Sequence, residues 1–442
     1  MALTRLVAAL ALSAAIVSAT ASVASADPPW SSPAVVPGTG NGPAAVTSRG
    51  HVAAFTTSDR AQPPGTASQL LRLSPTDGSV LSATGVDLAG TAVAAYAKDA
   101  IAVAGSSIGP SGTVDDQSRV RAGTTSAVGG TPALRTLPGT QGQNVTAVVG
   151  NTRGDIALST RGLRTRMVFL RRAGTTTFSR VLTINVSSTA RDVTVALSPH
   201  GRLLVVWEDR HEVFARHRGT RSWGAVHSLG PGVQSNLQAG IDETERLMVA
   251  WKSQRVSEGA SSTPAVVSFI TAAPGHGFGT RRTIETVGQT GAGRYVGAPA
   301  VRLQVVGRDT ALLAWTGFDG DHFVARAAPL SQGHVGARRQ LSPAGVDAVL
   351  GDVATAPDGR ALALWRDNVA GADPVPGRQP NLFANVRAAG AAAFGAPEAV
   401  GGDARVVFSP PTALVDPVSG SALALFTDFA TSRALVSVRP AP

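Results

Sequence analysis

The stretch VALSPHGRLLVVWEDR, residues 195–210, contains a short apolar run, a polar turn with Gly201, a second apolar run and then Trp207. Two such runs joined by a turn glycine are typical of a β-hairpin. Clear copies of this phrase end at Trp251, Trp315, Trp365 and Phe426, and weaker copies end at Phe55, Gly105 and Ser159. The hairpin is therefore the repeating unit of the chain.

A second repeated phrase lies between the hairpins: an arginine-bearing strand, a glycine, an aromatic residue and a further strand. Its copies surround Phe178, Trp223, Phe278 and Phe394. Successive anchors of the first phrase are 44 to 64 residues apart, and periods near 50 are typical of propellers. No segment has the apolar spacing of an amphipathic helix. We predict an all-β fold, a single β-propeller of about eight, alternatively seven, four-stranded blades.

The two ends of the chain suggest how the ring closes. After Phe426 only one more strand is evident, from Arg433 to Arg439, whereas the phrase WSSPAVVPG that begins at Trp30 resembles the last strand of a unit. We expect the segment from Trp30 to Val36 to complete the blade that carries Phe426. Such closure would hide the edges of the ring from aggregation.

The N-terminal residues predict the compartment. An apolar run from Leu6 to Ala19 is followed by Ala24, Ser25 and Ala26, an A-x-A cleavage pattern. This predicts a signal peptide over residues 1–26 and a secreted, extracellular propeller over residues 27–442, with a retained membrane anchor as the alternative. After cleavage no membrane span remains, and we expect a monomer.

Composition excludes several kinds of site. The chain has no cysteine, which removes disulfides, thiolate metal sites and cysteine nucleophiles. The net charge of +10 comes almost wholly from arginine, a bias that is typical of high-GC bacterial coding. Such a surface attracts anionic polymers in a salt-dependent way. No basic run interleaved with aromatics occurs, so specific binding of nucleic acid is not expected.

The repeats resemble those of propeller proteins secreted by high-GC bacteria, some of which are loosely similar to sialidases. The resemblance spans Trp30 to Arg439 and implies the propeller fold; it implies little about function. A sialidase-like enzyme would need a tyrosine nucleophile, for which Tyr295, preceded by Arg294, is the one placeable candidate. The S-x-D-x-G-x-x-W box of those enzymes is missing.

Polar side chains gather where strands end. Carboxylates follow the second strand of several units, and two arginines lie beside them: Asp59, Asp209, Arg210, Asp319, Asp321, Arg366, Asp367 and Asp428. Near the starts of first strands lie Asn144, Asp192, Asn236 and Asp352. Because both kinds of loop share one face of a blade, these side chains could ring one mouth of the channel and bind hydroxyl-rich ligands or cations. The alternative is turn chemistry, in which Asp and Asn accept backbone hydrogen bonds.

Other motifs carry weaker predictions. The tryptophans recur at fixed places in the repeat, which favours packing between blades over sugar stacking. The pair Asp319 and Asp321 could contribute to a calcium site but lacks the other ligands of an EF-hand, so no cofactor is predicted. Two insertions, Ser253 to Pro264 and Asn368 to Pro380, are candidate binding loops.

The sequence thus predicts a non-catalytic propeller that binds an extracellular glycan, an anionic envelope polymer or a protein on one channel face. The alternative is a glycoside hydrolase or lyase of sialidase-like type acting on acidic glycans, with Tyr295 and channel-facing carboxylates doing the chemistry.

Overall fold

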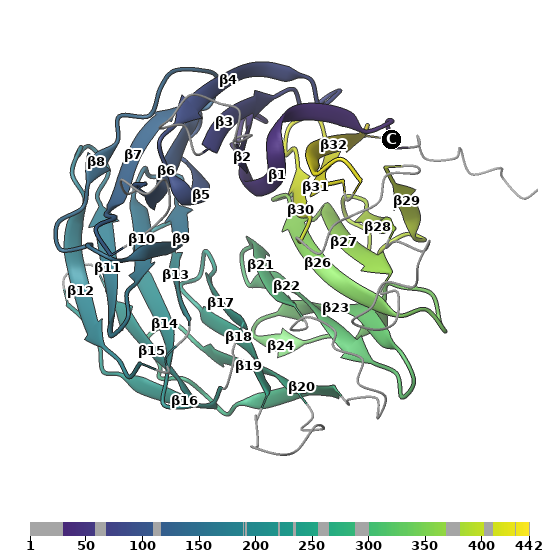
Figure 1. Ribbon diagram of the computed structural model, residues 1–442. Coiled ribbons are helices and arrows are strands. Elements are labelled where there is room, and N and C mark those ends of the chain that lie inside the picture. The colour runs from purple at the N-terminus through teal and green to yellow at the C-terminus, as the bar shows by residue number, and fades with distance from the viewer. Residues whose placement is uncertain are drawn as a thin grey trace, which may run out of the picture.

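All regular structure in the described part of the chain is β-strand. The computed structural model describes residues 30–441 except 58–67, 109–115, 189, 191, 220–221, 233–235, 255–264, 288–299, 368–380, 402–409 and 429. In these residues no helix is found, and so none that could cross a membrane. Figure 1 shows the sheets set around a central opening, with the chain running once around the ring. The predicted all-β propeller is confirmed.

Six of the seven sheets begin with a strand beside the opening and step outward through antiparallel neighbours (Figure 1). Three of them come from the first half of the chain: β5(Ala89–Tyr96), β6(Ala100–Ser106), β7(Val120–Ser126) and β8(Arg135–Thr136); β9(Asn144–Gly150), β10(Ile156–Arg161), β11(Thr165–Arg171) and β12(Ser179–Asn185); β13(Val193–Leu197), β14(Leu203–Asp209), β15(Glu212–Arg218) and β16(His227–Pro231).

The next three sheets follow the same order, and the second of them has a fifth short strand. Their strands are β17(Asn236–Ile241), β18(Leu247–Gln254), β19(Ala265–Ala272) and β20(Arg282–Val287); β21(Val301–Gly307), β22(Thr310–Phe318), β23(Phe323–Ser331), β24(His334–Val335) and β25(Arg339–Gln340); β26(Ala348–Thr355), β27(Ala361–Asp367), β28(Leu382–Arg387) and β29(Glu398–Val400).

The seventh sheet has seven strands and joins both ends of the described chain in the order β30, β31, β32, β1, β2, β3, β4. Its strands are β1(Ala34–Val46), β2(Val52–Thr57), β3(Ser68–Leu73), β4(Val80–Val86), β30(Thr412–Val415), β31(Ala422–Thr427) and β32(Arg433–Arg439). The early part of β1 pairs with β32, with Ala34 opposite Val436, and its later part pairs with β2, with Ala44 opposite Ala54. Gly38 has a φ of 105° at the register shift where β1 changes partner, a conformation that glycine adopts without strain.

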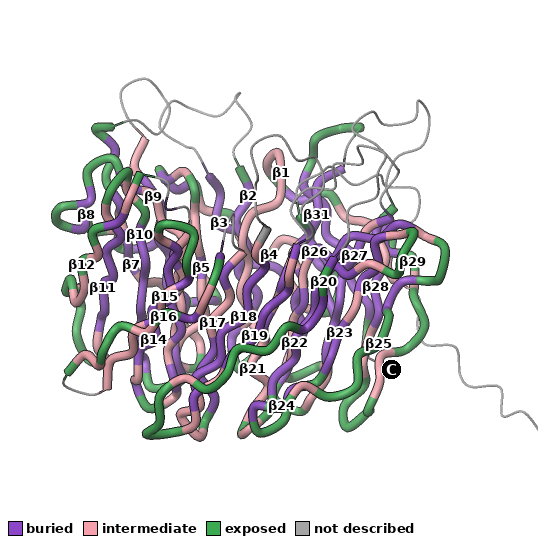
Figure 2. Tube along the Cα trace, turned by 90° about the horizontal axis from the view of Figure 1, so that it is seen from below, coloured by how far each residue is buried: buried purple, intermediate pink, exposed green. Residues whose placement is uncertain are grey.

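The hydrophobic core lies between neighbouring sheets. Trp251, Trp315 and Trp365 are each less than 2% exposed, and each packs in a cluster that spans two adjacent sheets. A buried aromatic side chain of this size removes about 150–250 Å² from water, so each anchor contributes strongly to the join between sheets. Figure 2 shows the buried strands in the body of the ring and the exposed turns at its two rims. The tryptophans of the second strands therefore pack between blades, as predicted.

The strand order sorts the loops into two faces. Because the strands are antiparallel, loops from the second to the third strand of a sheet, and from the last strand to the next sheet, lie on one face of the ring, here called the loop face. Turns from the first to the second strand, and from the third to the fourth, lie on the other face, here called the turn face. The glycines of the turn-face hairpins, Gly201, Gly359 and Gly420, have φ of 87°, 88° and 81°. These are the turn glycines of the sequence repeat.

Candidate functional site

Two of the predicted carboxylates hold loops together on the loop face. Asp209 Oδ1 accepts hydrogen bonds from the backbone nitrogen (2.8 Å) and the hydroxyl (2.6 Å) of Ser187, in the loop that precedes its sheet. Asp367 is buried and accepts from the backbone nitrogen of Asn381 and from its side-chain amide (3.3 Å). These carboxylates have the contacts that the turn-chemistry alternative predicts.

Two others organise their own turns. Asp319 Oδ1 accepts from the backbone nitrogens of Asp321 (3.1 Å) and His322 (2.8 Å), and the bond from His322 is the main cause that lowers the pKa of Asp319. Asp428 Oδ2 accepts from the backbone nitrogen (3.0 Å) and hydroxyl (2.6 Å) of Thr431. Among the described residues no three His, Cys, Asp or Glu side chains gather as metal ligands would.

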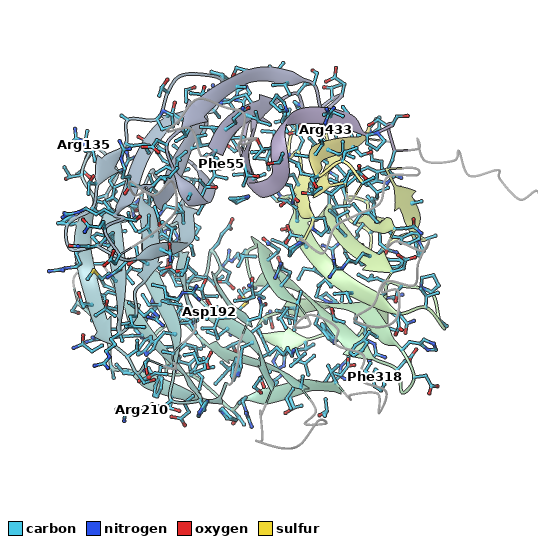
Figure 3. The ribbon with its side chains drawn as sticks, viewed as in Figure 1. Phe55, Arg135, Asp192, Arg210, Phe318 and Arg433 are labelled. Carbon is cyan, nitrogen blue, oxygen red and sulfur yellow. The ribbon has the colours of Figure 1, made fainter. Side chains whose placement is uncertain are left out.

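Three further charged members of the predicted ring differ in exposure. Arg210 is exposed in a tight turn, with a φ of 50°, and Figure 3 places it at the outer edge of the ring, far from Asp192. Asp321 is exposed on its loop. Arg366 is half-buried, and burial lowers its pKa. Arg210 therefore does not lie with Asp192 at one mouth of the channel.

A different group, at the first strands, links neighbouring sheets at several junctions. Asp192 accepts hydrogen bonds from the backbone nitrogens of Val193 (3.0 Å) and Leu237 (3.3 Å), and burial is the main cause that raises its pKa. Asn236 accepts from the backbone nitrogen of Val301 (3.1 Å). The sequence did not indicate this role, because it depends on which sheets are neighbours.

Asp352 makes a similar link from the middle of β26 rather than from its start. One of its oxygens accepts from the backbone nitrogen of Ala413 (3.0 Å) and the other from Arg302 Nε (2.9 Å). Asp352 thus connects three consecutive sheets. The bond to Arg302 is an ion pair in which both side chains are about one-fifth exposed.

A groove of about 880 Å³ lies on the loop face between the sheets β5–β8 and β9–β12. Three loops line it, and they contribute Asp116, Gln141 to Asn144, and Gly162 to Thr165. Leu163 in this lining is 77% exposed. Of the predicted site residues, Asn144 is the one that lines this groove. We call this the loop-face groove.

The base of the loop-face groove is fixed by hydrogen bonds. Gln143 is buried, donates from Nε2 to Thr165 Oγ1 (3.1 Å) and accepts from the hydroxyl of Thr160. Ser106 Oγ donates to the side-chain oxygen of Asn144 (3.1 Å). These contacts join two sheets and link the loop before β9 to the loop after β10.

A second cavity, of about 1090 Å³, lies on the turn face between the sheet β26–β29 and the strands β30–β32. Its walls carry Trp30, Arg360, Arg387, Phe394, Glu398 and Arg439, together with several alanines. We call this the seam cavity, and the sequence analysis did not find it. The one available signal was the alanine-rich copy of the second phrase, RAAGAAAFG, at residues 387–395.

A buried lysine was also missed. Lys252, which follows Trp251 in β18, is 1% exposed, and burial lowers its pKa to about 8. Its cross-strand neighbour Val267 belongs to the cluster shared with the next sheet, so Lys252 faces the junction with β21–β24. No carboxylate among the described residues forms an ion pair with it. Sequence position alone could not distinguish this lysine from one on the surface.

Several predicted features lie outside the described residues. They are Asp59, Tyr295 with Arg294, residues 255–264 of the first insertion, and the second insertion from Asn368 to Pro380. The enzyme alternative, which depends on Tyr295, therefore stays a prediction.

Comparisons with known proteins identify the fold. No family model matches the chain, and no curated protein matches it. The WD40 domain of SCAP from fission yeast superimposes with a TM-score of 0.51 and 9% identity, over 92% of this chain and 98% of that one. Chaetomium thermophilum Sqt1, bound to the N-terminus of the ribosomal protein L10, gives a TM-score of 0.54 and 11% identity, over 94% and 100% of the two chains. At these identities the likeness shows the propeller fold alone.

A weaker likeness is to the apo form of prolyl oligopeptidase B from Galerina marginata, with a TM-score of 0.44 and 10% identity. The match covers 76% of this chain and spans 46% of that one, about half of its length.

Proposed function

We propose that this protein is a secreted, non-catalytic propeller that binds an acidic glycan of the cell exterior on its loop face. The observation that carries the proposal is the loop-face groove, whose lining combines amides, charged groups and an exposed leucine on a fixed base. Concave sites with a few placed polar groups are typical of ligand binding. Amide side chains donate to and accept from hydroxyl groups, which suits a sugar.

Two further arguments favour an acidic, extracellular ligand. The net charge of +10, almost all from arginine, attracts anionic polymers. Within the groove, Arg164 is the cation available to an acidic ligand, and the lining also contains one carboxylate, Asp116. The apolar run before Ala26 has the pattern of a cleaved leader, which supports secretion. The propeller Sqt1 binds a protein segment, so the fold is compatible with a binding role.

We also infer that the ring consists of eight blades, with β1 shared between the last blade and the first and with the outer strand of one blade split into β24 and β25. The inference is supported by the two pairings of β1 and by the contacts of the innermost strands, which run from β1 through β5, β9, β13, β17, β21 and β26 to β30 and back to β1. Projection images of single particles along the ring axis should show eight lobes, and seven would contradict the inference.

The glycan proposal is tested by binding to an array of acidic and neutral polysaccharides, followed by titration of the best ligand. We expect acidic polysaccharides to bind best and the affinity to fall as salt rises. The double variant Gln141→Ala and Arg164→Ala should bind at least about tenfold more weakly, because it removes exposed contacts and leaves the buried Gln143 in place.

The matched control is Arg135→Ala, which removes an exposed arginine on β8 outside the groove lining, at the edge of the ring (Figure 3). Its affinity should equal that of the unmodified protein. If the control and the double variant lost the same affinity, the effect would come from net charge alone, and binding at the loop-face groove would be contradicted. Turnover of the bound polysaccharide that is abolished by Tyr295→Phe would replace the proposal with the hydrolase or lyase.

A further inference from the structure

The seam cavity is a separate site on the opposite face of the ring. One wall is a chain of three side chains in which Glu398 is the centre. Its carboxylate accepts from Trp30 Nε1 (2.9 Å) and takes two bonds from Arg439, at 2.8 and 3.1 Å. Arg439 is 3% exposed, so this ion pair is shielded from solvent on one side. Glu398 and Arg439 therefore neutralise one another within the wall.

Arg360 is also paired, but at the rim. Its guanidinium bonds to Asp358, a partly exposed carboxylate of the same turn. The side chain reaches across to the neighbouring sheet and lies against Gly420, where a Cβ atom would collide with Arg360 Nη1. A side chain at this position would require the end of Arg360 to move, and the φ of 81° at Gly420 also favours glycine.

Arg387 is the cation of the cavity that lacks a carboxylate partner among the described residues. Its Nε donates to the backbone oxygen of Gly359 (2.9 Å), and the guanidinium lies over the ring of Phe394, 5.6 Å from its centre. Both contacts fix the side chain. Burial lowers the pKa of Arg387, which reflects the cost of keeping a cation there without an anion. Its two terminal nitrogens make no hydrogen bond to any described residue.

Most of the remaining lining is small and apolar. The loop from β28 to β29 contributes alanines at positions 388, 389, 391, 393 and 396. Phe394 lies beside the open guanidinium, and the indole of Trp30 lies on the other wall. A ligand for this cavity would thus meet one fixed cation, two aromatic rings and a methyl-lined surface.

We propose that the seam cavity binds a small carboxylic acid with an apolar body, whose carboxylate pairs with Arg387 and whose body lies against the alanines and Phe394. The arginine fork matches a carboxylate in two-point hydrogen bonding. An amine would be repelled by Arg387, and a neutral alcohol could accept a hydrogen bond from it but would bring no negative charge. This site is independent of the loop-face groove and extends the proposed function.

Calorimetric titration with octanoate, octanol and octylamine tests the ligand class. We expect octanoate to bind at least about tenfold more tightly than octanol, and octylamine to bind most weakly. Arg387→Met should lower octanoate affinity about tenfold to a hundredfold, the range for loss of a charge-assisted hydrogen bond. In this variant octanoate and octanol should bind with similar affinity. Arg387→Lys, which keeps the charge but not the fork, should be intermediate.

Two further variants serve as controls. Arg135→Met removes an arginine elsewhere and should leave octanoate affinity unchanged. Ala391→Trp fills the cavity from an exposed loop position and should weaken both octanoate and octanol, even if Arg387→Met proves unstable. Equal binding of octanoate and octanol, no octanoate binding, or full affinity in folded Arg387→Met would each overturn the proposal. Polysaccharide binding by these variants is scored separately, so failure here is distinguishable from failure at the loop face.

Discussion

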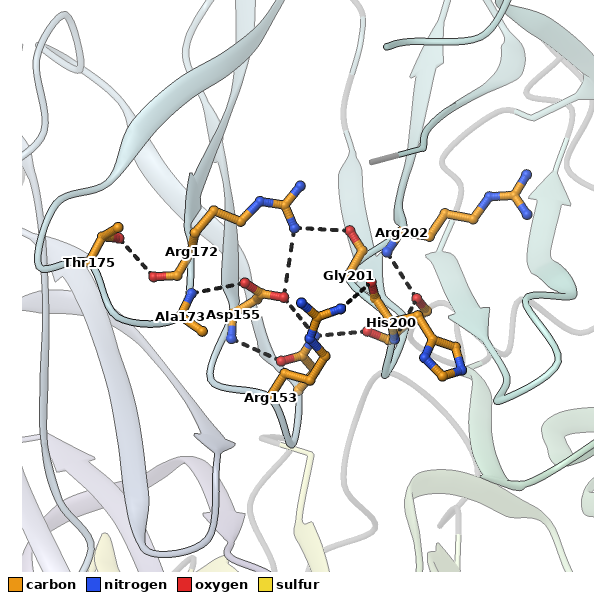
Figure 4. A network of polar contacts seen from close by, with 10 residues as sticks. Arg153, Asp155, Arg172, Ala173, Thr175, His200, Gly201 and Arg202 are labelled. Carbon is orange, nitrogen blue, oxygen red and sulfur yellow. Dashed lines mark hydrogen bonds and ion pairs between the residues drawn. The ribbon is translucent and has the colours of Figure 1, made fainter. Parts of the chain in front are cut away.

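Two junctions between neighbouring sheets, built from the same repeat, differ in how their turn faces are filled. At the junction of β9–β12 with β13–β16, a carboxylate lies between two arginines and the next turn (Figure 4). Asp155 accepts from the backbone nitrogen of Ala173 (3.0 Å) and lies 3.7 Å from Arg172 Nη1, which donates to the backbone oxygen of Gly201 (3.2 Å). Arg153 donates to the backbone oxygen of His200 (2.8 Å). We call this the closed junction, because these hydrogen bonds link the two sheets at the turn face.

The junction of β26–β29 with β30–β32, which contains the seam cavity and is called the open junction here, has different residues at the same places. Asn151 N donates to Asp155 O (3.1 Å) just as Ala356 N donates to Arg360 O (2.9 Å), so Arg360 occupies the place of Asp155. Ile156 pairs with Arg171 and Ala361 pairs with Arg387, so Ala388 occupies the place of Arg172. The open junction therefore has a cation, Arg360, where the closed junction has the carboxylate of Asp155. It has a methyl group, that of Ala388, where the closed junction has the long side chain of Arg172.

The difference teaches that the scaffold and the cavity are separable. Both junctions keep the strand pairing, the turn glycine and the buried core beneath, so the ring does not need the polar network in order to form. What the network supplies is local filling and charge balance. Where it is missing, the same backbone leaves a cavity beside Arg387, whose counterpart at the other junction is Arg171, and such a cavity can bind a ligand.

The largest expected effect in this comparison is on stability. Asp155→Ala should lower the free energy of unfolding by about 3 kcal/mol, because the buried Asn151 Nδ2 loses one of its two acceptors, the nitrogen of Ala173 loses its acceptor, and Arg172 loses the nearby carboxylate. The matched variant in the open junction, Asp358→Ala, removes a partly exposed partner and should cost at most about 0.5 kcal/mol.

Urea unfolding of both variants measures the contrast, with the midpoint shifting at constant slope. If the two losses were equal, Asp155 would not be holding its junction closed, and the comparison would fail.

A third junction, between β17–β20 and β21–β24, contains a buried cation of another kind. Burial holds the pKa of Lys252 at about 8, below the 10.5 of an exposed lysine. Between these values the unfolded chain binds the proton that the folded chain releases, so the free energy of unfolding should rise with pH from about 8 to 10.5. The whole rise is about 3 kcal/mol at about 1.4 kcal/mol per unit.

Lys252→Met should remove this pH dependence and stabilise the protein at about pH 7 by about 2 kcal/mol, since no buried charge then has to be kept. Lys98→Met, at the other lysine of the chain, changes an exposed side chain and should leave the pH profile as it was. A profile that stays steep in Lys252→Met would assign the dependence to another group.

The fold could be predicted from the sequence because the same pattern of residues recurs in successive blades. Trp251, Trp315 and Trp365 recur at one place in the hairpin, and recurrence of a large apolar residue is what packing between repeated sheets requires. The turn glycines recur for the same reason. These features depend on local chain geometry, which a single sequence displays.

The site was harder to predict because it depends on contacts that a sequence does not display. Asp209 and Asp428 were correctly placed at strand ends, but whether a carboxylate faces a channel or its own turn depends on the loop conformation. The links from Asp192 and Asn236 depend on which sheets are neighbours. The seam cavity depends on missing side chains, and only a comparison of equivalent places in two junctions reveals the missing volume.

The most direct test of the comparison, with a small expected effect on stability, rebuilds the closed junction inside the open one. Arg360→Asp combined with Ala388→Arg restores the carboxylate and the long side chain at the places of Asp155 and Arg172. We expect the pair to add up to about 1 kcal/mol to the free energy of unfolding, with each single change neutral or destabilising, so that a double-mutant cycle shows favourable coupling.

The same pair should lower octanoate affinity at least about tenfold, because a carboxylate enters the cavity while the introduced arginine fills it and pairs with that carboxylate rather than with a ligand. Coupling without loss of affinity would place the acid outside the seam cavity. Loss of affinity without coupling would mean that the added charges repel the ligand but do not form the network. Both effects together are expected if the identities of two side chains decide whether this junction is a closed joint or a binding site, since the backbone is the same in either case.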